Sequence, residues 1–194
     1  MSVRRNSLGD APLFAWGEAL RARQARQRRL VRRCAFTACG LGALVLTVIV
    51  PPLPRLVWNA SASAPVGFYT VSPGAAPVTG QMVIARVPPR YRQLAAQRRY
   101  IPVNVPLVKR VAAGPGAEVC ALGPQVFVDG HPVARRLAHD AKGRVMPQWQ
   151  GCRILGRGQH FLLMPGSPSS FDGRYFGISP STDIIGTARL LWAG

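Results

Sequence analysis

Lys109 is the residue whose type and surroundings most directly suggest chemistry. It is one of only two lysines beside 23 arginines, and it lies in the apolar stretch Val105–Val111. An arginine stays protonated in proteins, whereas a lysine in apolar surroundings can lose its proton. Lysine at this position therefore suggests a neutral amine that acts as a general base. Taken alone, the residue is more simply explained as an ordinary lysine whose stem covers a strand edge.

Acidic residues are too few to favour a site built from carboxylates. The 194-residue chain has seven Asp and Glu residues and a net charge of +18. This shortage argues against a hydrolase with paired carboxylates and against a carboxylate-built metal site. The basic charge invites a nucleic-acid partner. However, nine arginines lie within residues 1–33, where membrane headgroups explain them as well as DNA does, so we expect no nucleic-acid partner.

An uncharged run, residues 34–54, follows this basic segment. At the helical rise its length covers about 30 Å, which is enough for a bilayer core. Only Arg55 follows the run closely, so the positive-inside rule places the arginine-rich side in the cytoplasm. We predict a basic cytoplasmic segment (1–33), a transmembrane helix (34–54) and a periplasmic domain (55–194) of a single-pass inner-membrane protein.

A cleaved signal peptide is the alternative to this anchor. Both Ala60-Ser61-Ala62 and Ala62-Ser63-Ala64 fit the A-x-A pattern of a cleavage site. The basic region and the apolar run are both long for a signal peptide, and the candidate sites lie several residues beyond the apolar run. These features favour the uncleaved anchor.

The four cysteines divide between the two parts of the chain. Cys34 and Cys39 lie in the apolar run, where free thiols behave as small apolar groups. Cys120 and Cys152 are the only cysteines of the exported part, and an oxidising compartment favours a disulfide between them. Two separate buried thiols remain the alternative.

The exported part is predicted to be mostly β, because prolines and glycines interrupt it every few residues and helical periodicity is scarce. The Asp129-Gly130 pair predicts a two-residue hairpin turn. Residues 90–99 fit either a short helix or a loop. The predicted strands cover 67–71, 81–87, 105–111, 125–128, 131–134, 159–164 and 183–192.

Four motifs follow the apolar run in order. They are Asn59–Tyr69, Val108–Gly116 with K-R-V-A-A-G-P-G, Met164–Gly177 ending in D-G-R-Y-F-G, and Ile185–Ala188. Together they resemble the conserved boxes of the type I signal peptidases, which are Ser/Lys-dyad proteases anchored by an N-terminal transmembrane helix. The resemblance covers about residues 31–192. It implies a signal-peptidase-like, β-rich catalytic domain behind one transmembrane helix.

Two departures narrow the resemblance. The general signal peptidases carry S-M-x-P after the anchor, where this chain has Ser63-Ala64-Pro65 within S-A-P-V-G-F-Y. They also carry G-D-N at the start of the third box, which this chain lacks, so no role is transferred to that acidic residue. Both features look like the conjugative-transfer, TraF-type branch. Members of that branch process the pilin precursor of a mating-pair apparatus.

The resemblance assigns roles residue by residue. Ser63 becomes the nucleophile and Lys109 the general base, in agreement with the apolar surroundings of the lysine. The Ser61 hydroxyl and the Ser63 backbone N–H become the oxyanion donors, and Ser170 orients the lysine. Asp172 and Arg174 correspond to a structural ion pair that supports the site.

Histidines offer a competing arrangement. A Ser/His/Asp triad would need one of three histidines, and none of them lies in a local motif. The spacing of these histidines and the cysteines does not suit a zinc site either. Serines after an anchor are also common in plain linkers, which the other three motifs argue against. The three histidines are His131, His139 and His160.

The sequence therefore predicts a membrane-anchored serine endopeptidase that needs no metal or cofactor. Its partners would be the lipid bilayer and a membrane-associated, pilin-like preprotein. This substrate would bind as an added strand beside the segments after Ser63 and before Lys109. The resemblance implies small side chains at the first and third positions before the cleaved bond, and it allows cyclisation of the product. The alternatives are a general secretory signal peptidase and a non-catalytic, membrane-tethered component of pilus or conjugation assembly.

Overall fold

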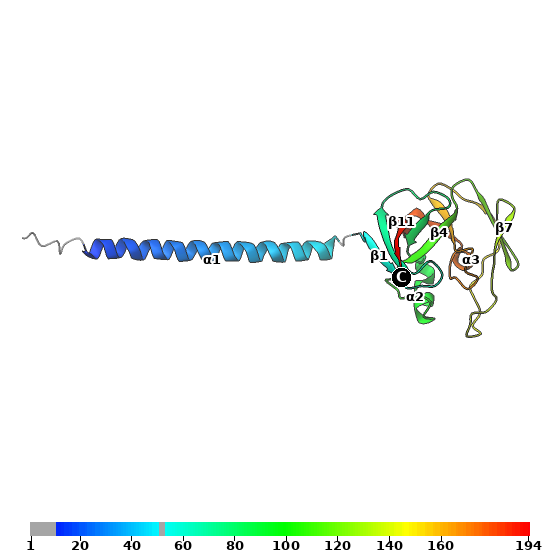
Figure 1. Ribbon diagram of the computed structural model, residues 1–194, viewed down its shortest axis with the longest axis horizontal. Helices are drawn as coiled ribbons and strands as arrows, with labels where there is room; N and C mark the ends of the chain where they lie inside the picture. The colour runs from blue at the N-terminus through cyan, green and yellow to red at the C-terminus, as the bar shows by residue number, and fades with distance from the viewer. Residues whose placement is uncertain (1–10, 51–52) are drawn as a thin grey trace, which may run out of the picture. The chain divides into compact units, whose positions relative to one another are not determined.

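The computed structural model describes residues 11–50 and 53–194. The chain divides into two units, Met1–Pro52 and Leu53–Gly194. Figure 1 shows the first as a single long helix and the second as a folded domain rich in strands. The first ten residues of the predicted basic segment, together with Pro51 and Pro52, lie outside the described residues.

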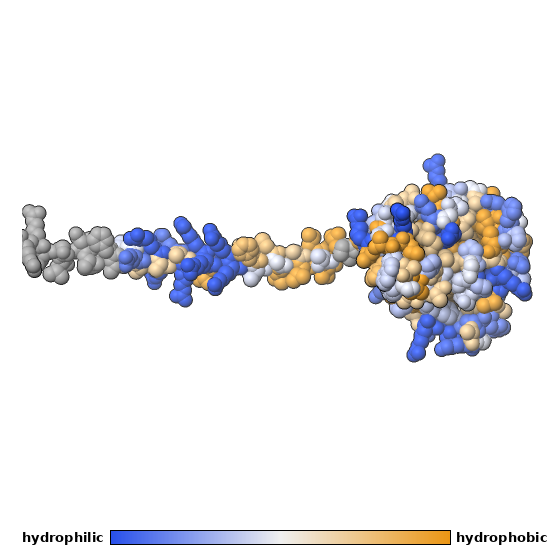
Figure 2. Space-filling model, viewed as in Figure 1, coloured by the Kyte–Doolittle hydropathy of each residue, from blue (hydrophilic) through white to orange (hydrophobic). Residues whose placement is uncertain are grey.

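The first unit contains the helix α1 (Ala11–Ile49). It includes most of the arginine-rich segment and residues 34–49 of the apolar run, and Figure 2 shows the change from hydrophilic to hydrophobic side chains along it. Its part from Trp16 to Ile49 is long and apolar enough to cross a membrane. At the helical rise, 39 residues span about 58 Å, roughly twice a bilayer core. Of the apolar run, residues 34–49 belong to this helix and span about 24 Å of its length.

The second unit is built on two antiparallel sheets, which confirms the predicted β-rich class. The larger sheet has seven strands in the order β1-β2-β11-β3-β4-β9-β10. All of the strands predicted for this sheet are present, with ends that differ by a few residues. The seven strands are β1 (Leu56–Asn59), β2 (Gly67–Pro73), β11 (Ile184–Ala193), β3 (Met82–Ala85), β4 (Leu107–Ala113), β9 (Gln159–Leu163) and β10 (Ile178–Pro180).

The smaller sheet has the order β7-β6-β5-β8 and lies at the far side of the domain from β1 (Figure 1). Its strands are β5 (Glu118–Leu122), β6 (Gln125–Val128), β7 (His131–Arg135) and β8 (Gly151–Ile154). Val128 pairs with His131 across the predicted Asp129-Gly130 turn. Both turn residues have positive φ, 48° and 76°, as a two-residue hairpin of this type requires.

The predicted disulfide joins two strands of the smaller sheet. Cys120 on β5 and Cys152 on β8 occupy directly opposite positions of the ladder, and their sulfur atoms are bonded. The β7–β8 connection, residues 136–150, therefore ends at a strand that is covalently fixed to its neighbour. Cys34 and Cys39 of α1 are free thiols.

Short helices cover one end of the larger sheet. Residues 90–99, which the sequence left open, form most of α2 (Pro89–Gln97), with a proline in its first turn. The helix α3 (Gly173–Phe176) follows Asp172, and a 3-10 turn (Ser181–Asp183) precedes β11. Aromatic side chains of the α3 region pack with residues beside α2 and β4 in one core cluster, which comprises Val87, Ala95, Leu107, Met146, Phe171, Tyr175 and Phe176.

Candidate active site

Ser61 and Ser63 lie in the loop that joins β1 to β2. The two strands pair from Leu56–Thr70 to Asn59–Gly67, which leaves residues 60–66 as the loop. Gly67 is required at its end, because its φ is 149° and a Cβ atom there would lie 2.1 Å from the carbonyl oxygen of Trp192. The loop is therefore confined between its own hairpin and the end of β11.

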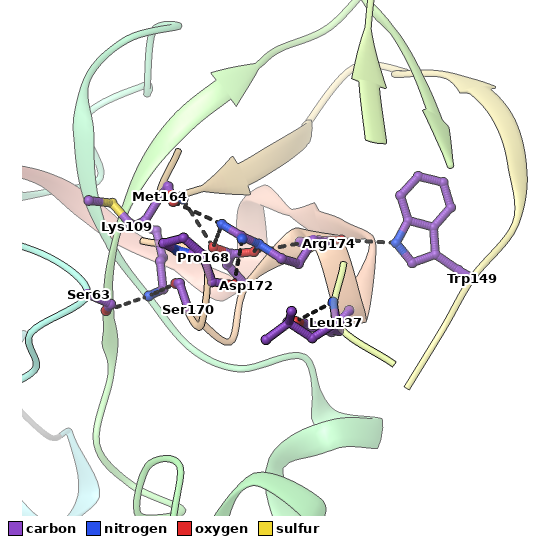
Figure 3. A network of polar contacts seen from close by, with 11 residues as sticks. Ser63, Lys109, Leu137, Trp149, Met164, Pro168, Ser170, Asp172 and Arg174 are labelled. Atoms are coloured by element: carbon purple, nitrogen blue, oxygen red, sulfur yellow. Dashed lines mark hydrogen bonds and ion pairs between the residues drawn. The ribbon is translucent and has the colours of Figure 1, made fainter. Parts of the chain in front are cut away.

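Lys109 extends from the middle of β4 and is 2% exposed. Its Nζ lies 2.9 Å from Ser63 Oγ and 2.8 Å from Ser170 Oγ (Figure 3). Three residues from separate motifs of the sequence thus meet at one nitrogen atom. This is the arrangement that the resemblance implied for nucleophile, base and orienting serine.

The surroundings of Lys109 favour the neutral amine. Burial is the main reason why the pKa of Lys109 is lowered from 10.5 to about 8. The Arg174 charge also lowers this pKa, whereas the Asp172 carboxylate raises it. A substantial fraction of the amine is therefore unprotonated at pH 8, whereas an exposed lysine would be almost entirely charged. A neutral Nζ within hydrogen-bond distance of a hydroxyl is able to accept its proton.

Asp172 and Arg174 form a buried ion pair below the serine–lysine contact. The Arg174 Nε atom lies 2.8 Å from Asp172 Oδ1, and the two side chains are 2% and 0% exposed. Arg174 also donates to the carbonyl oxygens of Met164 and Pro168, and Asp172 accepts from the Met164 N–H. Figure 3 shows this network beside Lys109. The pair fixes both ends of the turn that carries Ser170.

Ser61 lies against the nucleophile position. Its Oγ is 3.0 Å from Ser63 Oγ and accepts a hydrogen bond from the Ser63 backbone N–H at 3.3 Å. The two groups assigned to the oxyanion hole therefore bind each other in the free protein. A substrate carbonyl would have to replace this contact before both donors could face one oxygen atom.

A cavity of about 690 Å³ opens beside these residues. Its walls come from residues 57–63, 100–102 and 105–109, from the β7–β8 connection, and from Tyr175 and residues between Ser167 and Phe171. Residues 57–63, which end at Ser63, line the cavity. The sequence had instead led us to expect the substrate strand beside the segment after Ser63. Directly after Ser63, Ala64 belongs to the core at 4% exposure, whereas Pro65 is exposed.

Tyr100 and Asp140, which line the same cavity, belong to a second polar cluster. Tyr100 Oη donates to Asp140, and Arg144 forms an ion pair with Asp140 at 2.7 Å. The hydrogen bond from Tyr100 and those from Arg144 hold the pKa of Asp140 well below its usual range. The cluster joins the segment after α2 to the β7–β8 connection. Sequence analysis missed it, because it links two irregular segments that carry no motif.

The histidines provide neither a partner for Ser63 nor, with the cysteines, a metal site among the described residues. Among the described residues, neither His139, which lines the cavity, nor His160, which binds Ser181, bonds to Ser63. Glu118 lies near the sulfur atoms of Cys120 and Cys152. Those sulfurs are bonded to each other and are not available as thiolate ligands.

Comparison with known proteins decides the family. The family described as "Signal peptidase, peptidase S26" matches residues 28–193. The chain belongs to the signal peptidase S26 family. The four motifs and the β-rich domain of this chain are thereby explained by common descent.

The relatives place this chain in the TraF-type branch. It is 32% identical to a plasmid transfer protein TraF from Escherichia coli over 84% of this chain and 99% of that protein. It is also 32% identical to a conjugal transfer protein TraF from Agrobacterium fabrum, over 81% and 95% of the two chains. A crystal structure of a signal peptidase I from Enterococcus faecalis aligns with 17% identity and a TM-score of 0.35, over 58% of this chain and 97% of that chain.

Proposed function

We propose that the protein is a membrane-anchored serine endopeptidase in which Ser63 and Lys109 form the catalytic dyad. The observation that carries this proposal is the position of the buried Lys109 Nζ, 2.9 Å from Ser63 Oγ and 2.8 Å from Ser170 Oγ. Membership of the peptidase family supports it independently.

Acylation follows from these positions. Ser63 Oγ attacks the scissile carbonyl carbon while Lys109 Nζ takes the hydroxyl proton. The carbonyl oxygen becomes an oxyanion, which the Ser61 hydroxyl and the Ser63 backbone N–H stabilise after their mutual contact is broken. When the carbon–nitrogen bond breaks, the Lys109 ammonium returns the proton to the leaving amine. An ester between the substrate acyl group and Ser63 remains.

Ser170 and the buried ion pair support these chemical steps by holding Lys109 in position. Ser170 restricts the Lys109 amine to one direction, and Asp172 with Arg174 holds the Ser170 turn in place. The proposed steps use only side-chain and backbone groups of this chain together with water. They draw on no metal or organic cofactor.

The proposed substrate is a membrane-associated preprotein bound in extended form along residues 57–63 and 105–109. An exposed aromatic cluster supports action at a membrane surface. Trp58, which lines the cavity, contacts Phe68, whose ring stacks with Trp192, and the two tryptophans are 46% and 62% exposed. Exposed tryptophans of this kind are enriched at membrane–water interfaces. The family implies small side chains before the cleaved bond.

The proposed location is the inner membrane, with α1 as the single span and its arginine-rich part in the cytoplasm. The catalytic domain then lies in the periplasm, where the Cys120–Cys152 bond is stable. The relatives named as plasmid and conjugal transfer proteins favour a pilin-like precursor of a conjugation apparatus as substrate.

The acyl-enzyme can be resolved by water or by an amine. Hydrolysis gives a linear product, whereas attack by the N-terminal amine of the same polypeptide gives a circular one. A well-placed intramolecular amine can have an effective molarity of about 10⁵ M or more, which would outcompete water. Lys109 is placed to deprotonate either nucleophile.

A substrate panel with intact-mass analysis tests the proposal. The full-length protein in membranes is mixed with a pilin-like precursor and, separately, with several general secretory precursors. Cleavage of the pilin precursor alone supports the dedicated peptidase, and cleavage of the whole panel indicates a general signal peptidase. No cleavage of any precursor would favour a non-catalytic assembly component. A circular product weighs one water, about 18 Da, less than its linear counterpart, and this loss is the signature of attack by an amine.

A further inference from the structure

Asn59 makes an unusual set of hydrogen bonds to the loop that carries Ser63. The residue ends β1 and is 6% exposed. Its Nδ2 donates to the carbonyl oxygens of Ser61, Ala64 and Pro65, at 3.0, 3.1 and 3.0 Å. Its Oδ1 accepts from the Ser61 backbone N–H at 3.1 Å. Both polar atoms of the carboxamide therefore bond to this one loop.

The loop has few other internal contacts. Among the described residues, its only internal backbone bond is a long one of 3.4 Å, from the Ala64 N–H to the Ser61 carbonyl. Tyr69 Oη donates to the Pro65 carbonyl at 2.9 Å, and the Gly194 N–H donates to the Val66 carbonyl at 3.1 Å. Buried carbonyl groups need such partners. Asn59 supplies most of those between Ser61 and Pro65.

We propose that Asn59 is a positioning residue, whose carboxamide sets the distance and direction from Ser63 Oγ to Lys109 Nζ. The inference rests on the proposed dyad. The carboxamide of Asn59 bonds to the loop rather than to the lysine. It acts on both sides of the nucleophile, because it binds Ser61 before Ser63 and Ala64 and Pro65 after it.

The same bonds explain why the Ser61 backbone N–H is not an oxyanion donor. That N–H is engaged by Asn59 Oδ1. The Ser61 side chain is left to face Ser63, at 3.0 Å between their Oγ atoms. Asn59 therefore positions both proposed groups of the serine loop, the nucleophile and the hydroxyl donor.

Removal of the carboxamide should separate Ser63 from Lys109 and admit water to the lysine. Asn59→Ala deletes all four bonds. Asn59→Asp has nearly the same shape, but it replaces the Nδ2 donor with an oxygen that faces three carbonyl oxygens. If shape alone mattered, the Asp variant would behave as the wild type, whereas a role for the donor predicts that both variants fail. Asn104→Ala, at an exposed asparagine, is the matched control.

The two-lysine composition gives a readout that does not depend on activity. Full-length protein in detergent micelles, labelled with ¹³C at lysine Cε, should give two signals, from Lys109 and Lys142. In the wild type and in Asn104→Ala, Lys109 should titrate with a pKa of about 8. In Asn59→Ala the Lys109 pKa should move upward toward 10.5, because the amine becomes more hydrated. A midpoint that equals the wild-type value in folded Asn59→Ala would overturn the inference.

Kinetics provide the second readout. A displacement of about 1 Å at a reacting group can cost about 100-fold, so kcat should fall by about that factor in Asn59→Ala and Asn59→Asp, with little change in KM. Wild-type kcat in either variant would also overturn the inference. If the wild type cleaves no substrate, the dyad proposal fails on activity, while the lysine titration still decides whether Asn59 controls the loop.

Tyr69→Phe covers the case in which Asn59 variants do not fold. Tyr69 is 1% exposed, and phenylalanine keeps its packing while it removes the other side-chain donor to the Pro65 carbonyl. Asn59 remains to hold the loop in this variant. We therefore expect a fall in kcat of less than about tenfold and a Lys109 titration close to that of the wild type. A fall in kcat of about 100-fold in Tyr69→Phe, with a Lys109 pKa that moves toward 10.5, would show that Asn59 is not the residue that sets the loop.

Discussion

Lys109 Nζ lies 2.9 Å from Ser63 Oγ, although the residues are 46 positions apart in the sequence. Lys109 is on β4, and the loop of Ser63 leads into β2, from which β11 and β3 separate β4 in the sheet. The sheet must therefore curve enough to bring the β1–β2 loop to Lys109. The buried side chains Tyr69, Ile84 and Val108 of β2, β3 and β4 pack in one cluster and stabilise this curvature.

The lysine predicts the pH dependence of the reaction. The lowered pKa means that the fraction of neutral Lys109 rises as the pH increases through about 8. The value of kcat/KM should therefore increase with pH along an acid limb with a midpoint near 8. Lys109→Arg should be inactive at every pH because the guanidinium stays protonated. Lys142→Arg, at an exposed lysine, is the control, and an active Lys109→Arg variant would contradict the role of the lysine as base.

Ser61 predicts a defect confined to the chemical step. Ser61→Ala removes one proposed oxyanion donor and should lower kcat by about 10²–10³-fold, or about 3–4 kcal/mol of transition-state stabilisation. KM should change little, because the Ser61 hydroxyl is hydrogen-bonded to Ser63 in the free protein and its proposed role begins only when the oxyanion forms. Ser61→Thr keeps a hydroxyl and should recover part of the rate. An unchanged kcat in Ser61→Ala would mean that backbone donors suffice.

The Cys120–Cys152 bond predicts a stability effect without a chemical one. It closes a loop of about 33 residues, so replacing both cysteines with serine should lower the free energy of unfolding by about 3–4 kcal/mol. Urea denaturation of the full-length protein in detergent measures this change. The double variant Cys34→Ser and Cys39→Ser, in α1, should show no such loss. Equal unfolding midpoints for the Cys120/Cys152 variant and the wild type would reject the stabilising role.

The sequence predicted those features that have local signals. The Asp129-Gly130 turn follows from residues that tolerate positive φ, and the strand leading to Lys109 follows from its apolar residues. The short strands β1, β5, β8 and β10 were missed. β8, for example, is entirely exposed, so no alternation of apolar and polar residues marks it, and its pairing with β5 defines it instead.

The candidate site was predicted as a set of residues rather than as a geometry. The motifs identified Ser63, Lys109 and Ser170, and the structure brings the three side chains together. Asn59 stood inside the first motif without a role. An asparagine at a strand end has many ordinary explanations, and only the folded loop reveals that three carbonyl oxygens share its Nδ2.

The most direct test of the account is the processing of a pilin-like precursor by membranes that contain wild-type protein or the Ser63→Ala variant. Ser72→Ala, at an exposed serine on β2, provides the matched control. The account predicts that Ser63→Ala accumulates in the membrane as a folded protein with the Cys120–Cys152 bond intact, yet yields no mature product. Ser72→Ala should process the precursor at the wild-type rate. Mature product formed by Ser63→Ala at the wild-type rate would contradict the assignment of Ser63 as the nucleophile.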